Sequence, residues 1–410
     1  MKCAVLAAGE GTRMRPLTQN KPKVMLPVAG KPILHHVLDS LKAAGLSDFV
    51  FLVGYKGDVI KEYFGDGSKF GIQIKYAIQG EQLGTANAVA CLKEHFCKEK
   101  NGFIQINGDT LVKPEAIRAL AKSSNTMLTV REVPNPQDFG VVEVKGASVL
   151  RIVEKPKLPP SNLANAGAYK FFPDIFDAIE STRQSSRREY EITDSIQMLI
   201  DSGKKVAYNK IEWWIDVGKP WDLLAANEIL MKGMKSAKGE IKGVVEQYAV
   251  LKGAVSVGEG TVIRGGAYID GPVIIGKNCR IGPNCYIRPN TCIGDNCHVG
   301  AGTELKNTIL MNNSNAPHLN YVGDSVIGER CNLGAGTKIA NLRNDGANVY
   351  SVLKDKVVDT GRRKMGAIIG DDVKTGINVS INVGTVIGAG AMISYGRSVH
   401  GYVPPGARVI

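Results

Sequence analysis

The chain has 410 residues, of which 44% are hydrophobic and 22% charged, and its formal net charge is +12. This length exceeds one ordinary core, so we expect at least two domains, and no tract has the composition of a disordered segment. The positive charge suits an anionic partner. It is spread thinly, with no Lys/Arg block longer than "GRRK" (361–364), which argues against binding to nucleic acid.

Three further features predict a cytoplasmic protein that does not span a membrane. No apolar run approaches the roughly 18 residues of a membrane helix. The apolar start "MKCAVLAAG" is too short for a secretory signal. The eight cysteines include no CxxC pair, which fits a reducing compartment.

Residues 1–232 alternate short apolar runs with amphipathic segments. "KCAVLAAG", "DFVFLVG" and "GFIQING" are predicted strands, and "PILHHVLDSLKAAG" and "TANAVACLKEHF" are predicted helices. This alternation predicts a Rossmann-like α/β domain with a mostly parallel sheet and helices on both faces. Ligands of such sheets bind beyond the carboxyl ends of the strands.

A glycine-rich loop follows the first predicted strand. Gly9 and Gly11 let the backbone approach a phosphate closely, and successive N–H groups can form an anion nest. The loop is neither a Walker motif nor a dinucleotide fingerprint. Arg13 lies in the loop and Lys23 follows ten residues later, and two cations beside a glycine nest suit a triphosphate.

Two aspartates are candidate magnesium ligands. Asp109 closes the apolar strand "GFIQINGD", and Asp216 follows "EWWI". Magnesium prefers carboxylate oxygens, and in-line attack on an α-phosphorus needs charge neutralisation more than a protein nucleophile. Either aspartate alone could equally cap a turn.

From about residue 245 the pattern changes to a period of six. A six-residue period fits neither an α-helix nor a hairpin meander and is typical of a parallel β-helix, in which three hexads form one triangular coil. The predicted inward aliphatics are Val257, Ile263, Ile269, Ile275, Ile281, Ile287, Ile293, Val299, Leu305 and Met311, followed by Ile327, Leu333, Ile339, Ile369, Ile387, Ile393 and Val399.

The change of pattern predicts the domain organisation. We expect a first domain at 1–232, a linker at 233–247 and a β-helix domain at 248–410. The period lapses between Asn341 and Gly366, so an inserted loop or hairpin is predicted at about 341–366. Four cysteines two residues before an inward aliphatic are predicted to pack in the core rather than bind metal: Cys279, Cys285, Cys297 and Cys331.

Two cations interrupt the glycines that usually follow an inward aliphatic. Arg288 and Lys306 are 18 residues apart, one full coil, so they should lie on adjacent strands about 4.8 Å apart. Like charges at this spacing are destabilising unless an anion bridges them. Asp270, one coil earlier, would offset part of this charge.

The hexad pattern also breaks at "NAPHLNYVGDSVIG" (315–328). The lapse at Pro317 is predicted to let His318 leave the wall of the coil. Histidine is the side chain best suited to remove a proton near neutral pH. The other histidines are predicted to be structural: His35, His36, His95, His298 and His400.

Ordered motifs across the first half resemble the signature of sugar-1-phosphate nucleotidylyltransferases. They are "LAAGEGTRMRPLT…KPKVMLPVAGKP", "EQLGTANAV", "INGDT", "FGVVEV", "IVEKP", "NAGAY" and "WIDVGKPWD". The resemblance implies that Arg13 and Lys23 contact the triphosphate and that Asp109 and Asp216 bind Mg²⁺. It also implies nucleotide contacts at Leu6, Ala8, Gly9, Gly11, Gln79, Gly84 and Thr85, and sugar-phosphate contacts at Gly140, Glu154, Lys155 and Asn165.

The second half resembles the acetyltransferase part of bifunctional N-acetylglucosamine-1-phosphate uridylyltransferases, which is a left-handed β-helix. The matching motifs are "E-x-K", "H-L-x-Y-x-G-D", "N-x-G-A-G-T" and "A-N…DGAN". The resemblance implies that His318 is the general base and that Arg288 and Lys306 hold a phosphate. Tyr321, Asn332 and Asn341 would surround the amino sugar, and Lys364 would re-enter the site after the insertion.

The whole chain therefore resembles the archaeal form of this bifunctional family. Such an enzyme would use acetyl-CoA, amino-sugar 1-phosphates and a nucleoside triphosphate, and would form a homotrimer. "GTRMRPLT" and Asp216 are nearer to thymidylyl- and guanylyltransferases, which leaves UTP and dTTP open. Leu342, where the bacterial enzyme has tyrosine, leaves glucosamine and galactosamine open.

Two alternatives stay open at this stage. One is a monofunctional glucose-1-phosphate thymidylyltransferase or mannose-1-phosphate guanylyltransferase with a non-catalytic β-helix. The other is a regulatory subunit without activity. A regulatory subunit need not keep the complete set of Arg13, Lys23, Asp109 and Asp216.

Overall fold

The computed structural model describes residues 1–234 and 239–410. The chain divides into two compact units, each built from separate segments. The first unit contains Met1–Glu10, Pro22–Met25 and Ile33–Asp216. The second contains Gly11–Lys21, Leu26–Pro32 and Val217–Ile410. None of the described helices is long and apolar enough to cross a membrane.

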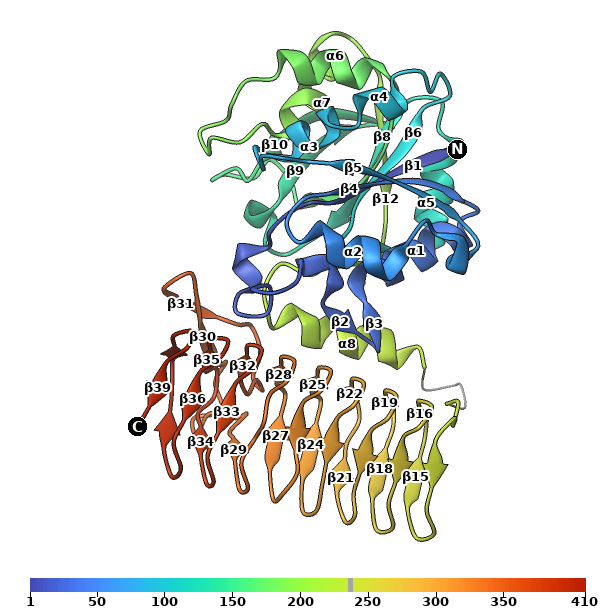
Figure 1. Ribbon diagram of the computed structural model, residues 1–410. Coiled ribbons are helices and arrows are strands. Elements are labelled where there is room, and N and C mark those ends of the chain that lie inside the picture. The colour runs from blue at the N-terminus through green and yellow to red at the C-terminus, as the bar shows by residue number, and fades with distance from the viewer. Residues whose placement is uncertain (235–238) are drawn as a thin grey trace. The chain divides into compact units, whose positions relative to one another are not determined.

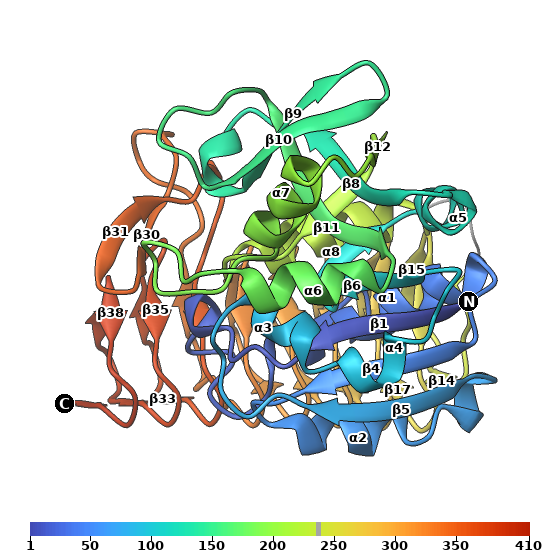
Figure 2. The ribbon, with the colours of Figure 1, turned by 90° about the horizontal axis from the view of Figure 1, so that it is seen from above.

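The first unit is an α/β domain around a nine-stranded sheet (Figure 2). In spatial order the strands are β5 (Gln73–Ile78), β4 (Asp48–Val53), β1 (Lys2–Ala7), β6 (Phe103–Asn107), β11 (Leu163–Phe171), β8 (Thr126–Glu132), β12 (Val206–Lys210), β10 (Ser148–Glu154) and β9 (Gly140–Lys145). β5, β4, β1 and β6 are parallel, as expected. β11 is antiparallel to β6, β8 and β9, and β10 to β9 and β12, so the sheet is mixed rather than mostly parallel.

Helices pack on this sheet in two groups. α1 (Ile33–Ala43) packs against α5 (Pro114–Lys122), whereas α3 (Thr85–Ala90), α6 (Asp174–Ser181) and α7 (Ile192–Asp201) pack together. α2 (Gly57–Phe64) follows β4 in the chain. The helix predicted from "TANAVACLKEHF" is divided into α3 and α4 (Lys93–Phe96). A separate antiparallel pair, β7 (Thr110–Val112) and β13 (Trp214–Asp216), carries residues of the candidate site.

The second unit is a left-handed parallel β-helix whose coils contribute strands to three sheets (Figure 1). Face 1 holds β14 (Val244–Val245), β17 (Val262–Ile263), β20 (Arg280–Ile281), β23 (His298–Val299), β26 (Asn315–Ala316), β33 (Lys374–Thr375), β36 (Met392–Ile393) and β39 (Arg408–Val409). Face 2 holds β15 (Val250–Lys252), β18 (Tyr268–Asp270), β21 (Tyr286–Ile287), β24 (Glu304–Lys306), β27 (Tyr321–Gly323), β29 (Lys338–Ile339), β34 (Ser380–Ile381) and β37 (Ser398–Val399). Face 3 holds β16 (Val255–Val257), β19 (Val273–Ile275), β22 (Thr291–Ile293), β25 (Ile309–Leu310), β28 (Val326–Ile327), β32 (Ile368–Ile369), β35 (Val386–Ile387) and β38 (Tyr402–Val403).

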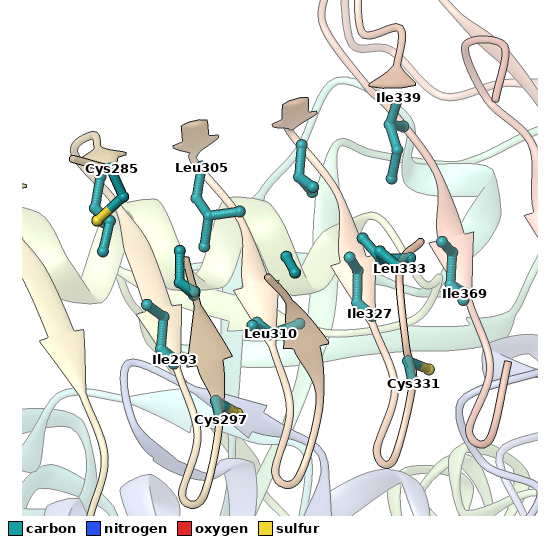
Figure 3. Packing of buried hydrophobic residues seen from close by; sticks show 14 of the residues in the cluster. Cys285, Ile293, Cys297, Leu305, Leu310, Ile327, Cys331, Leu333, Ile339 and Ile369 are labelled. Carbon is teal, nitrogen blue, oxygen red and sulfur yellow. The ribbon is translucent and has the colours of Figure 1, made fainter. Parts of the chain in front are cut away.

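The core of the β-helix is a column of stacked aliphatic side chains (Figure 3). The predicted inward positions from Val257 to Leu305 are buried in it. Cys279, Cys285, Cys297 and Cys331 are buried there too, which confirms that they pack in the core. Burial raises the pKa of the Cys285 and Cys331 thiols to about 12, so both stay neutral.

The coil does not break at residues 315–328, which corrects the sequence prediction. Leu310, rather than Met311, pairs with Ile293, and Ala316 pairs with Val299, so this coil has 17 residues instead of 18. Ala316 and Val322 then continue the buried column. Single residues are missing at corners occupied by Asn307 and Asp324, both of which have a positive φ. The shift in phase, together with a small inward alanine, hides the repeat in the sequence.

The predicted insertion is a hairpin. β30 (Tyr350–Leu353) and β31 (Lys356–Asp359) are antiparallel and are joined by Lys354 and Asp355. Both turn residues have a positive φ, as the favoured two-residue hairpin turns require. An antiparallel bridge between Leu342 and Lys364 closes the base of the insertion.

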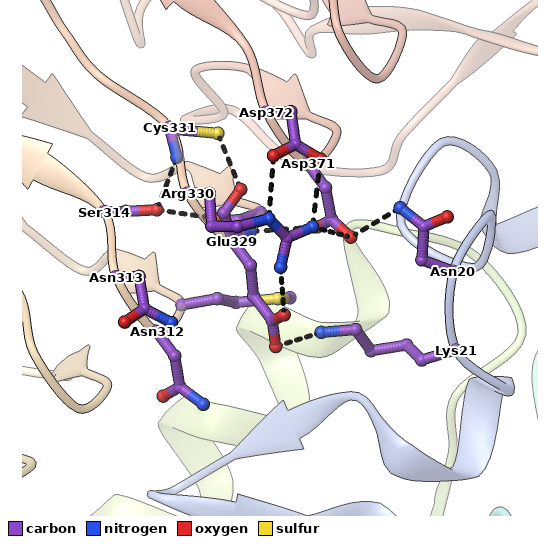
Figure 4. A network of polar contacts seen from close by, with 12 residues as sticks. Asn20, Lys21, Asn312, Asn313, Ser314, Glu329, Arg330, Cys331, Asp371 and Asp372 are labelled. Carbon is purple, nitrogen blue, oxygen red and sulfur yellow. Dashed lines mark hydrogen bonds and ion pairs between the residues drawn. The ribbon is translucent and has the colours of Figure 1, made fainter. Parts of the chain in front are cut away.

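Segments from outside the coils pack onto the β-helix within the second unit. α8 (Asp222–Lys232) contributes Asn227, which is fully buried, accepts a hydrogen bond from the Ala29 backbone and donates one to the Asn290 carbonyl, both at 2.8 Å. Ala29 is in the turn between β2 (Pro27–Val28) and β3 (Lys31–Pro32). In the same unit, Lys21 forms an ion pair with Glu329 (Figure 4).

Two of these observations bear on the predicted domain boundaries. α8, within the predicted first domain, is grouped with the second unit. Of the predicted linker, residues 235–238 lie outside the described part of the chain, and β14 already pairs with β17.

Candidate active sites

The loop after β1 is held open by contacts from neighbouring elements of the first unit. The Ala8 carbonyl accepts hydrogen bonds from the Tyr55 backbone at 3.0 Å and from Gln82 Nε2 at 2.9 Å. The Leu6 carbonyl accepts one from the Gly108 backbone at 2.8 Å. Gly9 is exposed, and a Cβ atom there would meet nothing within 4 Å. The loop can therefore receive a ligand at Gly9, and Gln82 is a supporting residue that the sequence did not single out.

Three further residues predicted around the base, Gln79, Gly84 and Thr85, lie at the end of β5 and at the start of α3. The Gln79 side chain is buried and donates to Asn87 Oδ1 at 2.7 Å. Gly84 has φ 119°, and a Cβ there would lie 2.5 Å from the Tyr190 carbonyl oxygen. Thr85 Oγ1 accepts a hydrogen bond from the Ile192 backbone at 2.9 Å. The segment before α7 thus fixes this wall of the site, and Gly84 allows the close backbone approach.

Lys23 and Asp109 form an ion pair, so the structure brings together a predicted triphosphate ligand and a predicted metal ligand. Asp216 ends β13 and pairs in register with Thr110, the residue after Asp109. Asp216 therefore lies on the strand next to β7, and Asp109 lies in the turn directly before β7. No group of three potential metal ligands occurs in residues 1–234 and 239–410. A hard cation held by Asp109 and Asp216 would need phosphate or water oxygens to complete its shell.

Three of the four predicted sugar-phosphate residues lie on β9, β10 and β11, and Lys155 directly follows β10. A Cβ on Gly140 would lie 3.0 Å from Glu154 Oε2 and 3.5 Å from Asn165 Cβ, so the three residues are in contact. Lys155 Nζ is 3.9 Å from Glu154 Oε1. Asn165 donates to the Tyr169 hydroxyl at 2.6 Å. Burial raises the pKa of Glu154, and the nearby cations Lys155 and Arg187 partly oppose the shift.

Arg187 is a candidate site residue that the sequence analysis missed. Its Nη1 lies 3.2 Å from Glu154 and 3.1 Å from Glu191. Burial also raises the pKa of Glu191, followed by repulsion from Glu154. The only signal in the sequence was the charged run "RREYEITD" (187–194), which is otherwise typical of a solvated loop.

Gly11 and Arg13 belong to the second unit. Gly11 has φ 67° and precedes a short 3-10 helix, Thr12–Met14. Its carbonyl accepts a hydrogen bond from Thr18 Oγ1 at 3.0 Å, and Arg13 is exposed. Further along the loop, Asn20 donates to Asp371 Oδ2 at 3.1 Å (Figure 4).

In the β-helix, Lys306 ends β24 of face 2 and Arg288 directly follows the adjacent strand β21, so the two are neighbours, as the spacing predicted. Each has its own carboxylate: Arg288 Nη1 is 2.9 Å from Glu304 Oε1, and Lys306 Nζ is 2.7 Å from Asp324 Oδ2. The partners are therefore Glu304 and Asp324 rather than Asp270.

Tyr321 and Asn341 meet over Gly323. A Cβ at Gly323 would lie 2.5 Å from Asn341 Nδ2 and 2.9 Å from the Tyr321 hydroxyl. Burial raises the pKa of Tyr321, and Glu304 and Asp324 raise it further. The predicted sugar residues Tyr321 and Asn341 thus lie beside the two cation–carboxylate pairs.

His318 is exposed at the corner between faces 1 and 2. The next residue, Leu319, donates its backbone N–H to the Ala301 carbonyl, and the His318 carbonyl accepts from Gly336. Asn332 is on face 1, in register with Asn315 and Lys374. His298 pairs with Asn315 on that face, and its pKa is lowered by burial, Arg280 and His318. The structure therefore groups Asn332 with face 1 and Arg288, Lys306 and Tyr321 with face 2, and it places His318 at the corner between these faces.

Comparisons with known proteins find relatives for the first half of the chain and for nearly its full length. Residues 2–233 match the family model "Nucleotidyl transferase". The "bifunctional protein GlmU" of Methanocaldococcus jannaschii is 43% identical over 395 residues, covering 96% of this chain and 93% of that protein. A "bifunctional sugar-1-phosphate nucleotidylyltransferase/acetyltransferase" of Sulfurisphaera tokodaii is 39% identical and covers 98% and 97%.

The chain belongs to the family of bifunctional sugar-1-phosphate nucleotidylyltransferase/acetyltransferases.

A solved structure extends the likeness to the fold of the first half of this family member. A putative glucose-1-phosphate thymidylyltransferase from Bacillus anthracis matches with a TM-score of 0.51 and 28% identity, covering 56% of this chain and 94% of that one. Residues 269–391 match the model "GMPPB C-terminal domain". The near-full-length relatives carry bifunctional names, which supports the bifunctional enzyme over the monofunctional alternative.

Proposed function

We propose that the β-helix acetylates glucosamine-1-phosphate with acetyl-CoA and that the nucleotidylyltransferase domain joins the product to UMP from UTP, releasing pyrophosphate. The observation that carries this proposal is that one chain holds both constellations: Lys23, Asp109 and Asp216 in one unit, and the paired Arg288 and Lys306 in the other. The domains proposed for these reactions are 1–232 and 248–410. Galactosamine-1-phosphate and dTTP are the second candidates.

In the nucleotidyl transfer, an oxygen of the sugar phosphate attacks the α-phosphorus, and the bond from that phosphorus to the oxygen leading to the β-phosphate breaks. Arg13 and Lys23 neutralise the triphosphate. Glu154 accepts hydrogen bonds from sugar hydroxyls, and Lys155 and Arg187, both within 4 Å of that carboxylate, hold the sugar phosphate. The carboxylates of Asp109 and Asp216 fit Mg²⁺, which when bound supplies charge neutralisation at the phosphates.

In the acetyl transfer, the amine of the sugar attacks the thioester carbon, the carbon–sulfur bond breaks, and CoA leaves as the thiol. His318 removes the proton of the amine, because imidazole is the base matched to neutral pH. Arg288 and Lys306 hold the phosphate, and Tyr321, Asn332 and Asn341 bind the sugar. Asn332 is on face 1 whereas Arg288 is beside a strand of face 2, two coils earlier, which supports a site completed by a neighbouring subunit in a homotrimer.

The substrates also support a location. Nucleoside triphosphates and acetyl-CoA are cytoplasmic metabolites, and the eight cysteines are free thiols, which suits a reducing compartment. We therefore propose that the enzyme works in the cytoplasm.

The test is a substrate panel on the purified full-length protein. Thiol release from acetyl-CoA is measured with glucosamine-1-phosphate and galactosamine-1-phosphate, and pyrophosphate release with UTP and dTTP plus the N-acetylated sugar phosphates. We expect both half-reactions, with the highest kcat/KM for glucosamine-1-phosphate and UTP. Pyrophosphate release without thiol release would leave the monofunctional alternative.

A further inference from the structure

Asp324 is a buried carboxylate next to the proposed acetyl site that the mechanism above does not use. Its residue is 3% exposed, and it occupies one of the shortened corners of the β-helix, with φ 47°. A buried carboxylate is costly unless it is paired and hydrogen-bonded. Its partners should therefore show why it is there.

Three side chains converge on this carboxylate. Oδ2 accepts the Lys306 ammonium at 2.7 Å and the Asn341 amide. Oδ1 accepts Asn307 Nδ2 at 2.8 Å. Asn307, Asp324 and Asn341 follow one another at 17-residue intervals at the same corner of successive coils. These three residues form a ladder in which the Asp324 carboxylate is at the centre and an asparagine amide is on each side.

The ladder is itself held from outside the coils. Asn307 Nδ2 also donates to Glu228 Oε1 of α8 at 2.7 Å, and Glu228 pairs with Arg362 of the insertion. Two shortened corners and the insertion occur at this one corner, at Asn307, Asp324 and directly after Asn341. A third shortened corner lies nearer the C-terminus, between Val399 and Val403. Three departures from the regular coil therefore gather around the Asp324 carboxylate.

The two cation pairs differ in burial. The side chains of Arg288 and Glu304 are 36% and 34% exposed, whereas those of Lys306 and Asp324 are 19% and 4% exposed. An exposed pair is easily rearranged, but a buried carboxylate holds its partners in one geometry. A lysine on a flexible stem gains most from such a fixed partner, because otherwise its rotamer entropy is lost on binding.

We infer that Asp324 is a positioning residue that fixes Lys306 and Asn341 for the amino-sugar phosphate. This inference rests on the proposed acetyl transfer. It predicts that the carboxylate acts on the affinity for the sugar phosphate, through its two partners, and not on the affinity for acetyl-CoA.

The experiment compares steady-state thiol release by Asp324→Asn and the wild-type full-length enzyme. We expect KM for glucosamine-1-phosphate to rise about 10-fold or more, the scale of one lost hydrogen bond to a charged group. KM for acetyl-CoA and pyrophosphate release should stay within about two-fold. Asp371→Asn is the matched control, because Asp371 is equally buried in the β-helix (2% exposed) but is bonded to Asn20 and the Glu329 backbone.

A double-mutant cycle separates positioning from a general structural role. In a Lys306→Ala/Asn341→Ala background, Asp324→Asn should add less than about two-fold to KM. Full additivity, or equal rises in both KM values, would overturn the inference. If Asp324→Asn does not fold, Asn307→Ala, which removes one outer hydrogen bond of the ladder, should raise the same KM about three-fold, and an unchanged KM would contradict the inference.

Failure of the proposed function gives a different result. If the wild-type enzyme releases no thiol, or if Lys306→Ala leaves KM for glucosamine-1-phosphate unchanged, the acetyl site itself is wrongly assigned. If Lys306→Ala raises KM and Asp324→Asn does not, only the positioning role of Asp324 is wrong.

Discussion

The two candidate sites are assembled in different ways. In the first unit, site residues come from a loop, from strand ends and from the start of a helix, at irregular distances along the sequence. In the β-helix, Arg288, Lys306 and Gly323 follow one another at intervals of 17 or 18 residues, because each coil places its side chains above those of the previous coil. In a repetitive fold the spacing along the sequence therefore predicts which side chains are neighbours. In the α/β domain only the motifs predict which residues form the site.

Removal of magnesium should give the largest difference between the activities of the two sites. Asp109 and Asp216 are proposed metal ligands, and the β-helix site has none assigned. Chelation with EDTA should lower pyrophosphate release by roughly 10³-fold, because a metal ion contributes several kcal/mol of charge stabilisation. Thiol release from acetyl-CoA, measured in the same samples, should change less than about two-fold. An equal loss of both activities would mean that the sites are not independent.

Gly84→Ala probes a glycine of the first unit that is confined by backbone. At φ 119° a side chain is strained. The new Cβ would lie 2.5 Å from the Tyr190 carbonyl oxygen, which is a backbone atom and can move only if the segment before α7 moves with it. We expect the free energy of unfolding to fall by about 2 kcal/mol or more, together with a loss of nucleotidyl transfer. Urea denaturation measures the stability. Wild-type stability in this variant would contradict the tight packing at the start of α3.

Gly323→Ala probes the corresponding case in the β-helix, where side-chain ends confine the glycine. The new Cβ would displace Asn341 Nδ2 and the Tyr321 hydroxyl, and the Asn341 amide would lose its bond to the buried Asp324 carboxylate. We expect the free energy of unfolding to fall by about 1 kcal/mol, less than in Gly84→Ala. KM for glucosamine-1-phosphate should rise about 10-fold, corresponding to about 1.4 kcal/mol. A large loss of stability with normal KM would reverse the contrast with Gly84.

Glu154→Gln should give the smallest effect, and its sign depends on pH. Burial raises the pKa of Glu154, so the folded state binds a proton more tightly than the unfolded state, and wild-type stability falls as pH rises from the unfolded value of about 4.3. Glutamine does not titrate. Thermal unfolding between about pH 4 and pH 7 should therefore show the variant gaining on the wild type by less than about 1 kcal/mol. If the variant instead lost stability relative to the wild type as pH rises, the attraction of Arg187 and Lys155 for the carboxylate would outweigh the effect of its burial.

Much of the fold could be predicted from periodicity. The first strands and the inward column from Val257 to Leu305 follow directly from runs and spacing. The inward positions between Leu305 and Ile327 could not, because a corner that loses one residue leaves no local signal and Ala316 is too small to mark an inward position. The antiparallel strands β10 and β11 also escaped prediction, since a strand pattern does not state the direction of pairing.

The sites were predictable to different degrees. Motif resemblance found Gly140, Glu154 and Asn165, and the structure brings them into contact. Arg187 and Asp324 were missed, because a charge is recognised as part of a site only when its buried partners are known. Spacing predicted the Arg288–Lys306 neighbourhood but assigned the compensating charge to Asp270, since register alone does not show which way a carboxylate turns.

We propose that the chain carries two active sites whose activities are separable. The most direct test is to measure both half-reactions in His318→Ala and Asp109→Ala. His318→Ala should lose ~10²–10⁴-fold in thiol release, the scale of a general base, and keep pyrophosphate release. Asp109→Ala should do the reverse. Loss of both activities in either folded variant, or retention of acetyl transfer without His318, would contradict the account.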